Sequence, residues 1–316
     1  MKRILVVAAV IRREGKILIA KRPAHLHMGG LWEFPGGKVE AAEPVEAALL
    51  RELEEELGIA PTAFRPLIRI AHDYPDKSVC LDVWDVTAFR GEPQGLEGQP
   101  LAWVRPDELA LHEFPAANRP IVTAARLPAR YLITPDMISA AERQHWLEQR
   151  LARGAQLVLF RAPHLPRDAY LAEASDLLRT CRAAGAALML HGAVELLQDV
   201  AADGVHLPAR HLRAESVAGL PPGSWLAASV HDEHELALAT SLGADFVTLS
   251  PVATTSSHPG MAGMGWSSFA HLVRAAVLPV YALGGMTDTD VDRAREHGAQ
   301  GVAGITGLFA ETGDQS

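Results

Sequence analysis

Short apolar runs near the start of the chain predict a sheet. Residues 4–11 are almost all apolar, and residues 16–20 repeat that character after Glu14-Gly15, which predicts two strands joined by a tight turn. Residues 78–85 alternate apolar and polar side chains, so we expect a half-buried strand there, and residues 101–104 predict one more.

A helix is predicted between these strands. Pro44 suits its first turn, because the N–H that proline lacks would have no partner there. Gly58 suits its C-terminal cap, and residues 120–129 predict a second, closing helix. The apolar positions that give the first helix a side able to pack on a core are Val45, Ala48, Leu49 and Leu53.

From Tyr131 onward, short apolar runs alternate with Ala- and Leu-rich helical segments. Eight strands separated by helices predict an α/β fold of the (β/α)8 barrel type, although a doubly wound sheet explains the alternation equally well. The number of strands favours the barrel. The segment is short for that fold, so we expect tight loops and a small helix between the third and fourth strands. The eight runs are residues 131–134, 156–161, 187–191, 204–207, 225–231, 245–250, 279–284 and 301–305.

The pattern changes at residues 126–130, so we expect an N-terminal domain over residues 1–128 and a C-terminal domain over residues 129–316. Two domains agree with the length of 316 residues, and a hydrophobic content of 48% provides for two cores.

Charge and cysteine usage exclude several classes of partner. The net charge of −9 argues against nonspecific binding of nucleic acid or of anionic membranes, because both need a basic face. Cys80 and Cys181 lie far apart without metal-ligand spacing, as expected for a reduced, cytoplasmic protein. Residues 4–11 follow Lys2 and Arg3 as in a signal peptide, but the run is too short and lacks a clear cleavage site. No segment has the length needed to span a bilayer.

A set of residues at fixed spacing carries the candidate chemistry. Within a helix, Glu52, Glu55 and Glu56 fall at i, i+3 and i+4 and share one face. Three carboxylates on one face repel one another, so without a cation some of them must hold protons at neutral pH. The full set is Gly37, Glu43, Arg51, Glu52, Glu55, Glu56 and Gly58, with Leu53 and Ile59 at two apolar positions.

Hard oxygen ligands without a nearby Cys or His cluster favour Mg²⁺, with Mn²⁺ as the alternative. The reaction that this implies is metal-assisted attack of water on a diphosphate. A simpler explanation is a solvated acidic face with Arg51 as an ion partner within the helix. Too many positions match at fixed spacing for that explanation to suffice.

This spacing is identified as the Nudix box, and the first half of the chain resembles the MutT-type 8-oxo-dGTP diphosphatases. The resemblance implies an α/β/α sandwich with a mixed sheet and hydrolysis of a small nucleoside triphosphate, 8-oxo-dGTP, to the monophosphate and pyrophosphate. It also implies that Gly37 and Glu97 join the helix carboxylates at the metal site, and that Arg51 orients these carboxylates. The matching stretches are residues 34–38, the Nudix box, and residues 91–93, 97–100 and 114–118.

The same resemblance places Asn118 in the purine pocket, where an amide offers a donor and an acceptor to the altered base edge. Arg22, His27, Phe34 and Asp76 are implied around the nucleotide. Each has a simpler alternative: Asn118 as a turn residue before Pro120, Arg22 as a surface charge, His27 as a loop residue and Phe34 as core.

The second half resembles the thiamine phosphate synthase and TenI family over residues 131–308. The resemblance implies phosphate binding by the backbone of Gly284, Gly285 and Gly304, and it retains Arg161. The matching stretches are residues 131–134, 203–207, 229–231, 250–252 and 283–286.

The chain, however, lacks the residues that the synthase reaction requires. His191-Gly192 and His211 stand where the resemblance expects the Asn-Asp pair and the aspartate that bind magnesium, and His258 replaces a lysine. We therefore expect no thiamine phosphate synthase activity. His231 matches the catalytic histidine of TenI, a thiazole tautomerase, a role that suits its pKa. A tautomerase-like enzyme, a sensor of a phosphorylated ligand and an inactive scaffold all stay open, and we expect no metal cluster of His191, His206 and His258.

Two rival functions remain for the whole chain. A Nudix domain beside such a barrel could hydrolyse diphosphates of the thiamine pathway, which the MutT-like contexts of Glu97 and Asn118 disfavour. A non-catalytic ligand sensor is the other rival, and the complete carboxylate set disfavours it. The sequence makes no prediction of the oligomeric state.

Overall fold

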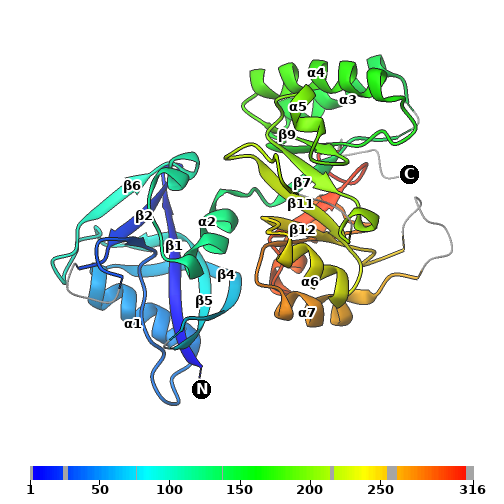
Figure 1. Ribbon diagram of the computed structural model, residues 1–316. Coiled ribbons are helices and arrows are strands. Elements are labelled where there is room, and N and C mark those ends of the chain that lie inside the picture. The colour runs from blue at the N-terminus through cyan, green and yellow to red at the C-terminus, as the bar shows by residue number, and fades with distance from the viewer. Residues whose placement is uncertain are drawn as a thin grey trace. The chain divides into compact units, whose positions relative to one another are not determined.

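The computed structural model describes residues 3–23, 28–75, 77–136, 138–213, 217–254 and 262–310. The chain divides into two compact units, Met1–Arg126 and Leu127–Ser316 (Figure 1). None of the described helices is both long and apolar enough to cross a membrane.

The N-terminal unit is built on a mixed sheet with the strand order β3-β2-β1-β5-β4, and β6 pairs with β2. Strands β1 and β5 run parallel, whereas the other pairs are antiparallel. The strands are β1 (Ile4–Arg13), β2 (Lys16–Lys21), β3 (Trp32–Glu33), β4 (Ala60–Asp73), β5 (Ser78–Arg90) and β6 (Leu101–Val104).

Helices cover both faces of this sheet. Helix α1 (Val45–Leu57) buries Ala48, Leu49 and Leu53 against one face, and α2 (Arg119–Arg126) buries Ile121 and other residues against the opposite face. The predicted α/β/α sandwich with a mixed sheet is thereby confirmed. Residues 78–85 form a strand, as expected, but the strand is not half-buried, because the two layers of helices leave β5 buried on both sides.

The ends of α1 follow the sequence. The helix begins directly after Pro44, and Gly58 ends it in the left-handed conformation with φ of 68°. The Gly58 N–H donates to the Glu54 carbonyl at 2.9 Å, which satisfies one of the free carbonyl groups at the helix end.

The C-terminal unit is a closed barrel of eight parallel strands in the order β10-β11-β12-β13-β14-β7-β8-β9. Strand β7 pairs with both β8 and β14, so the sheet closes and a doubly wound sheet is excluded. The strands are β7 (Arg130–Ile133), β8 (Leu157–Phe160), β9 (Ala187–His191), β10 (Gly204–Leu207), β11 (Trp225–Val230), β12 (Phe246–Leu249), β13 (Val280–Leu283) and β14 (Gly301–Gly304).

Helices surround the barrel, and Tyr131, Phe246 and Tyr281 fill its interior as a packed core. The segment between β9 and β10 holds only the four-residue α5, which confirms the small helix expected there. The helices are α3 (Ala140–Ala152), α4 (Arg167–Ala183), α5 (Leu196–Asp199), α6 (Glu233–Ser241), α7 (Gly265–Ala275) and α8 (Val291–Glu296).

Candidate active site

A glycine turn leads from β3 toward α1 and lies directly against β1. The Ala9 N–H donates to the Pro35 carbonyl, and the Val7 N–H donates to the Gly37 carbonyl, each at 2.8 Å. Gly36 has φ of 144°, and a Cβ there would collide with the backbone of Val7. Glycine is therefore required for the turn to lie this close to the sheet.

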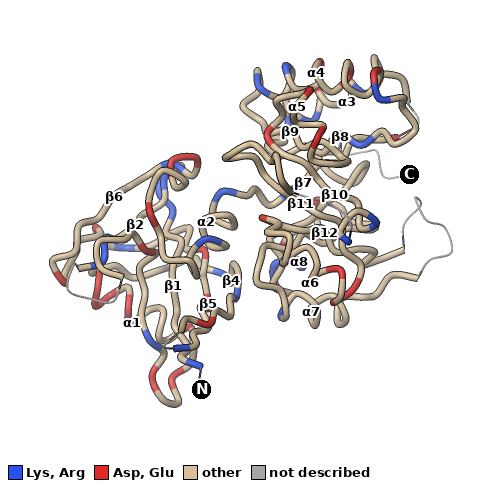
Figure 2. Tube along the Cα trace, in the orientation of Figure 1, with Lys and Arg blue, Asp and Glu red and all other residues tan. Residues whose placement is uncertain are grey.

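Glu52 of α1 lies against this turn. A Cβ placed on Gly37 would collide with the carboxylate of Glu52. Only 14% of the Glu52 side chain is exposed, compared with 62% for Glu55. The turn and the helix therefore position one carboxylate through direct contact. Figure 2 shows the acidic residues along α1.

Arg51 links the turn to the acidic face. Its guanidinium donates to both carboxylate oxygens of Glu43 at 2.9 Å, to Glu52 at 2.8 Å and to Glu55 at 3.1 Å. It also donates to the Lys38 carbonyl at 3.1 Å. Hydrogen bonding to Arg51 lowers the pKa of Glu43 to about 2. Arg51 thus contacts three carboxylates, and its role in orienting them stays a prediction.

Glu56 is the carboxylate most strongly affected by its surroundings. Burial, followed by the charges of Glu33, Glu97 and Glu52, raises its pKa to about 8, although it accepts a hydrogen bond from the Gly36 N–H at 3.0 Å. The raised pKa of Glu56 agrees with the expectation that, without a cation, a carboxylate of this face holds a proton at neutral pH.

A loop brings Glu97 to the C-terminal end of α1. The Leu96 N–H donates to the Glu56 carbonyl at 3.0 Å. The Gln99 side chain accepts from the Glu97 N–H at 2.9 Å and donates to the Glu56 carbonyl at 3.1 Å. Gln99 is buried, so it holds the loop and the helix together.

Gln99 and Glu33 also contribute to the site, and neither contribution was predicted from the sequence. Glu33 ends β3 next to the predicted Phe34, and its position directly before the glycine turn was the available signal. Burial is the main cause that raises its pKa, and the charge of Glu97 raises it further.

This donor set fits a divalent cation. The oxygens of Glu52, Glu55 and Glu56 belong to carboxylates on one helical face, and the raised pKa of Glu56 shows that its negative charge lacks compensation there. Within the described residues, no three acidic, histidine or cysteine side chains converge around one point, and Arg51 and the Gly36 N–H donate hydrogen bonds to these carboxylates. A metal held by Glu52, Glu55, Glu56 and Glu97 therefore requires side-chain rotations within this face.

The residues predicted around the nucleotide are only partly placed. His27 and Asp76 lie outside the described residues. Arg22 forms an ion pair with Glu33. Phe34 is 3% exposed and stacks on Phe114, with ring centroids 5.4 Å apart. Asn118 is half-buried in a 3₁₀ turn that leads into α2. The roles of these residues stay predictions.

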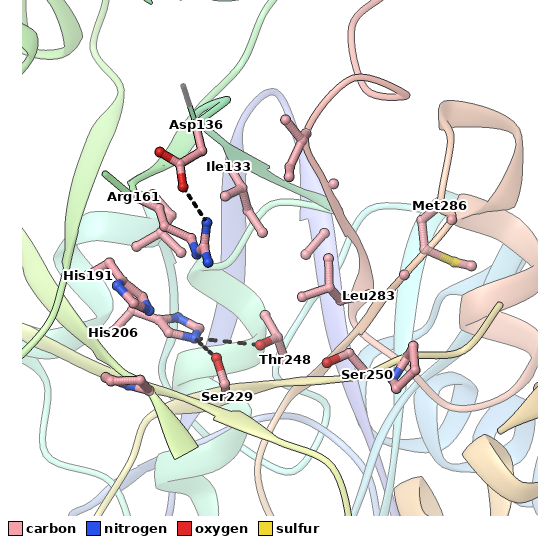
Figure 3. A pocket seen from close by; sticks show the side chains of 18 of the residues that line it. Ile133, Asp136, Arg161, His191, His206, Ser229, Thr248, Ser250, Leu283 and Met286 are labelled. Atoms are coloured by element: carbon pink, nitrogen blue, oxygen red, sulfur yellow. Dashed lines mark hydrogen bonds and ion pairs between the residues drawn. The ribbon is translucent and has the colours of Figure 1, made fainter. Parts of the chain in front are cut away.

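The barrel contains a cavity of about 860 Å³ at the carboxyl ends of its strands. The cavity brings together all five C-terminal candidates, and Figure 3 shows part of its lining. Gly284 has φ of 103°, and a Cβ there would approach the Pro251 Cα to 2.9 Å. The five candidates are Arg161, His231, Gly284, Gly285 and Gly304.

Two stacked histidines form part of the cavity wall. The ring centroids of His191 and His206 are 6.4 Å apart. His206 contacts the hydroxyls of Tyr131 at 3.2 Å and Ser229 at 2.9 Å. Burial is the main cause that lowers the pKa of His206 to about 3 and that of His191 to about 4, so both rings are neutral at pH 7. His258 lies outside the described residues.

His231 lies at the end of β11 and is oriented by Glu235. The Glu235 carboxylate contacts Nδ1 of His231 at 2.8 Å and accepts from its backbone N–H at the same distance. This contact leaves Nε2 of His231 for a ligand in the cavity.

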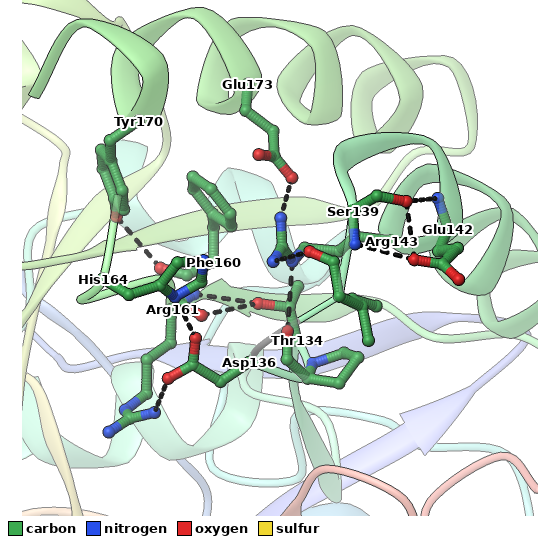
Figure 4. Close-up of polar contacts among 12 residues, drawn as sticks. Thr134, Asp136, Ser139, Glu142, Arg143, Phe160, Arg161, His164, Tyr170 and Glu173 are labelled. Atoms are coloured by element: carbon green, nitrogen blue, oxygen red, sulfur yellow. Dashed lines mark hydrogen bonds and ion pairs between the residues drawn. The ribbon is translucent and has the colours of Figure 1, made fainter. Parts of the chain in front are cut away.

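The loop after β7 is fixed by a buried arginine (Figure 4). Arg143 donates to the carbonyls of Pro135 at 3.1 Å and Ile138 at 3.0 Å, and it forms an ion pair with Glu173. The loop carries Asp136, which pairs with Arg161 at 3.3 Å at the cavity wall.

Comparisons with known proteins assign each unit to a family. Residues 6–124 match the NUDIX domain, and residues 130–308 match the thiamine monophosphate synthase family. The 8-oxo-dGTP diphosphatase of Escherichia coli (strain K12) is 41% identical over 123 residues, which cover 39% of this chain and 95% of that protein. The CTP pyrophosphohydrolase of the same organism is 44% identical over 124 residues, which cover 39% of this chain and 92% of that protein.

The C-terminal unit has relatives of its own. A protein of Aquifex aeolicus (strain VF5) named putative thiamine-phosphate synthase 2 is 31% identical over 185 residues, which cover 58% of this chain and 99% of that protein. The chain thus belongs to the Nudix family through its N-terminal unit, which is a hydrolase domain, and to the thiamine monophosphate synthase family through its C-terminal unit.

Proposed function

We propose that the N-terminal unit hydrolyses 8-oxo-dGTP to the monophosphate and pyrophosphate with Mg²⁺, on the carboxylate face of α1. The observation that carries this proposal is the packing of Glu52 against Gly37 beside Glu56, whose pKa of about 8 indicates a site arranged for a cation. The relatives named 8-oxo-dGTP diphosphatase support the substrate, at 41% and 47% identity.

Different residues would serve metal binding, carboxylate orientation and base recognition. Glu52, Glu55, Glu56 and Glu97 would hold the metal, and Arg51 keeps Glu52 and Glu55 near the turn. A bound divalent metal lowers the pKa of water and neutralises charge on the phosphoryl group. Water forms a new bond to phosphorus as the bridging P–O bond between the α- and β-phosphates breaks, which releases the monophosphate and pyrophosphate, and a carboxylate of the face accepts the proton of the water. We assign base recognition to Asn118, through its amide.

Hydrolysis of CTP is the second candidate, because the CTP pyrophosphohydrolase shares 44% identity with this unit. Values of kcat/KM for 8-oxo-dGTP, dGTP, CTP and thiamine diphosphate, measured with Mg²⁺, separate these functions. We expect 8-oxo-dGTP to be the best substrate. A higher kcat/KM for CTP or thiamine diphosphate would overturn the assignment to 8-oxo-dGTP. If none of the four compounds were hydrolysed, a non-catalytic ligand sensor would be the remaining function.

For the barrel, we propose binding of a small phosphorylated thiazole without metal, with the phosphate on the glycine loops and His231 available for proton transfer. Support comes from the cavity that these residues line together and from the contact between Glu235 and His231. We propose that it does not synthesise thiamine phosphate. Calorimetry of the full chain with thiazole phosphate and EDTA tests the binding, and an assay for thiamine phosphate tests the synthesis. Absence of binding, or measurable synthesis, would contradict the respective proposal.

A further inference from the structure

A buried acidic residue lies on the face of the N-terminal sheet that is opposite to α1. Side chains alternate along a strand, so Asp85 of β5 points to the same face as Val83, which belongs to the core beneath α2. Only 4% of the Asp85 side chain is exposed. A buried carboxylate is costly unless it is paired, and nucleotide hydrolysis on the face of α1 does not explain this one.

Two arginines are the partners of this carboxylate. Arg12, near the end of β1, donates from Nε to one oxygen of Asp85 at 2.5 Å. Arg65 lies directly opposite Asp85 in the ladder of β4 and β5, and it donates from Nη2 to the other oxygen at 2.7 Å. Each oxygen therefore has a guanidinium partner, and the buried carboxylate holds the side chain of Arg12 in one orientation.

Arg12 also contacts the last turn of α2. Its Nη2 donates to the Ala125 carbonyl at 3.0 Å. Carbonyl groups in the last turn of a helix have no partner within the helix, and a positive charge there interacts favourably with the helix dipole. Among the described residues, the side chain of Arg65 bonds to Asp85 and not to α2. Only one of the two arginines thus connects the carboxylate to the helix.

The packing of α2 on the sheet provides few constraints of its own. The helix is eight residues long, and its buried residues are Ile121, Thr123, Ala124 and Ala125. An alanine contributes a single methyl group, so within this fully described helix Ile121 is the one large apolar side chain that is completely buried. The charged hydrogen bond at Ala125 therefore adds a constraint on the position of α2 that the core does not supply.

The other end of α2 follows directly on Asn118. This residue ends the 3₁₀ turn Ala116–Asn118, and α2 begins at the next position. A helix rises about 1.5 Å per residue, so Asn118 and Ala125 lie roughly 10 Å apart along one short element. A shift of the helix at Ala125 therefore moves the amide to which we assign base recognition.

We propose that Arg12, held by Asp85, is a positioning residue for base recognition, because it fixes the C-terminal end of α2 and thereby the place of the Asn118 amide. The inference rests on the proposed function and extends it from the residue that contacts the base to the residues that hold it in place. In this role neither Arg12 nor Asp85 touches the nucleotide. A misplacement of about 1 Å can cost on the order of a hundredfold in rate, so a small shift of α2 is measurable.

The test is the ratio of kcat/KM for 8-oxo-dGTP to kcat/KM for dGTP, measured with saturating Mg²⁺. Arg12→Met keeps an apolar stem and removes the guanidinium. We expect this variant to lower the ratio by about tenfold, mainly through KM for 8-oxo-dGTP rather than kcat, because the carboxylates of α1 lie on the other face of the sheet. Arg12→Lys should recover part of the preference, since an ammonium can donate to the Asp85 carboxylate or to the Ala125 carbonyl.

Arg65→Met is the matched control, because it removes the other partner of Asp85 and leaves the contact between Arg12 and Ala125 in place. We expect it to preserve the ratio. An unchanged ratio in folded Arg12→Met, or an equal decrease in the two Met variants, overturns the positioning role. If Arg12→Met does not fold, Arg12→Lys and Arg65→Lys give the same comparison, with a smaller decrease expected for Arg12→Lys and none for Arg65→Lys.

Asn118→Ala separates this inference from the proposed function. If Arg12 acts through Asn118, Arg12→Met should lower the ratio no further in the Asn118→Ala background. A lower ratio in Asn118→Ala together with an unchanged ratio in Arg12→Met overturns the positioning role and leaves base recognition by Asn118 standing. An unchanged ratio in Asn118→Ala itself overturns base recognition by Asn118, and the positioning role with it.

Discussion

The carboxylate of Glu52 occupies the space that a Cβ on Gly37 would need. The backbone of Gly37 is outside the left-handed region, so an alanine there meets no conformational strain and only this steric conflict. A single methyl group can therefore displace one carboxylate from the acidic face.

Gly37→Ala should leave the protein folded and lower kcat/KM for 8-oxo-dGTP by roughly 10- to 100-fold, because Glu52 is displaced. A double-mutant cycle with Glu52→Gln checks the cause. If both changes act through the Glu52 carboxylate, the double variant is no slower than Glu52→Gln alone. Additive losses would show that Gly37 acts through something else.

Binding of Mg²⁺ should release a proton near neutral pH. The pKa of Glu56 is raised to about 8, so its proton must leave when a cation binds. Calorimetry in two buffers of different ionisation enthalpy should show close to one proton released at pH 7 and close to none at pH 9. Glu56→Gln should release almost none at either pH. Equal proton release by both proteins would contradict the assignment to Glu56.

The same group predicts how pH affects the metal-free protein. Because the pKa of Glu56 is raised in the folded state, its contribution to stability is complete below the unfolded pKa of 4.5 and is lost as pH rises through about 8. The free energy of unfolding, measured with urea in EDTA, should therefore decrease between pH 6 and pH 9 in the wild-type protein but not in Glu56→Gln. If the free energy of unfolding of the wild-type protein decreased no more than that of Glu56→Gln, the raised pKa of Glu56 would be contradicted.

Asn118→Ala should reduce the preference for 8-oxo-dGTP over dGTP more than it slows dGTP hydrolysis. Loss of the amide leaves donors and acceptors of the base edge unpaired, at a cost of about 1–3 kcal/mol. Kinetics on both nucleotides measure this effect, and exposed Arg119→Gln is the neighbouring control. An unchanged ratio would mean that Asn118 serves only the turn before α2.

Arg143→Leu should destabilise the barrel by about 3–5 kcal/mol, because it leaves buried Glu173 without its partner. Urea unfolding of the C-terminal unit measures this loss. Adding Glu173→Gln should restore part of the stability, whereas Arg179→Gln should cost less than about 0.5 kcal/mol. A loss below 1 kcal/mol for Arg143→Leu would show that the ion pair contributes little.

The sequence predicted elements whose patterns are local. All eight barrel strands were predicted because each is a short apolar run between helical segments. Strand β4 was missed: it contains Pro61 and Pro66, shows irregular register against β5 and is largely exposed in its first half. The two-residue β3 is too short for any periodic signal.

In the site too, residues placed by a local pattern were predictable and residues brought together only by the fold were not. Glu52, Glu55 and Glu56 were predictable because helical spacing alone places them on one face. Gln99 bonds to the Glu56 carbonyl 43 positions away, and Arg143 to Glu173 30 positions away, so only the fold brings each pair together. Arg143 is a charged residue in a polar helix, and its sequence context gives no sign of its complete burial.

Hydrolysis of the nucleotide on the carboxylate face of α1 is tested by the kcat for 8-oxo-dGTP, measured with saturating Mg²⁺ in two neighbouring variants. Glu55→Gln removes a carboxylate of that face, whereas Glu54→Gln removes a likewise exposed carboxylate at the preceding position, which lies outside that face. We predict a loss on the order of a hundredfold or more for Glu55→Gln and a change of less than about twofold for Glu54→Gln. Near-normal turnover by folded Glu55→Gln, or equal losses in the two variants, would contradict the account.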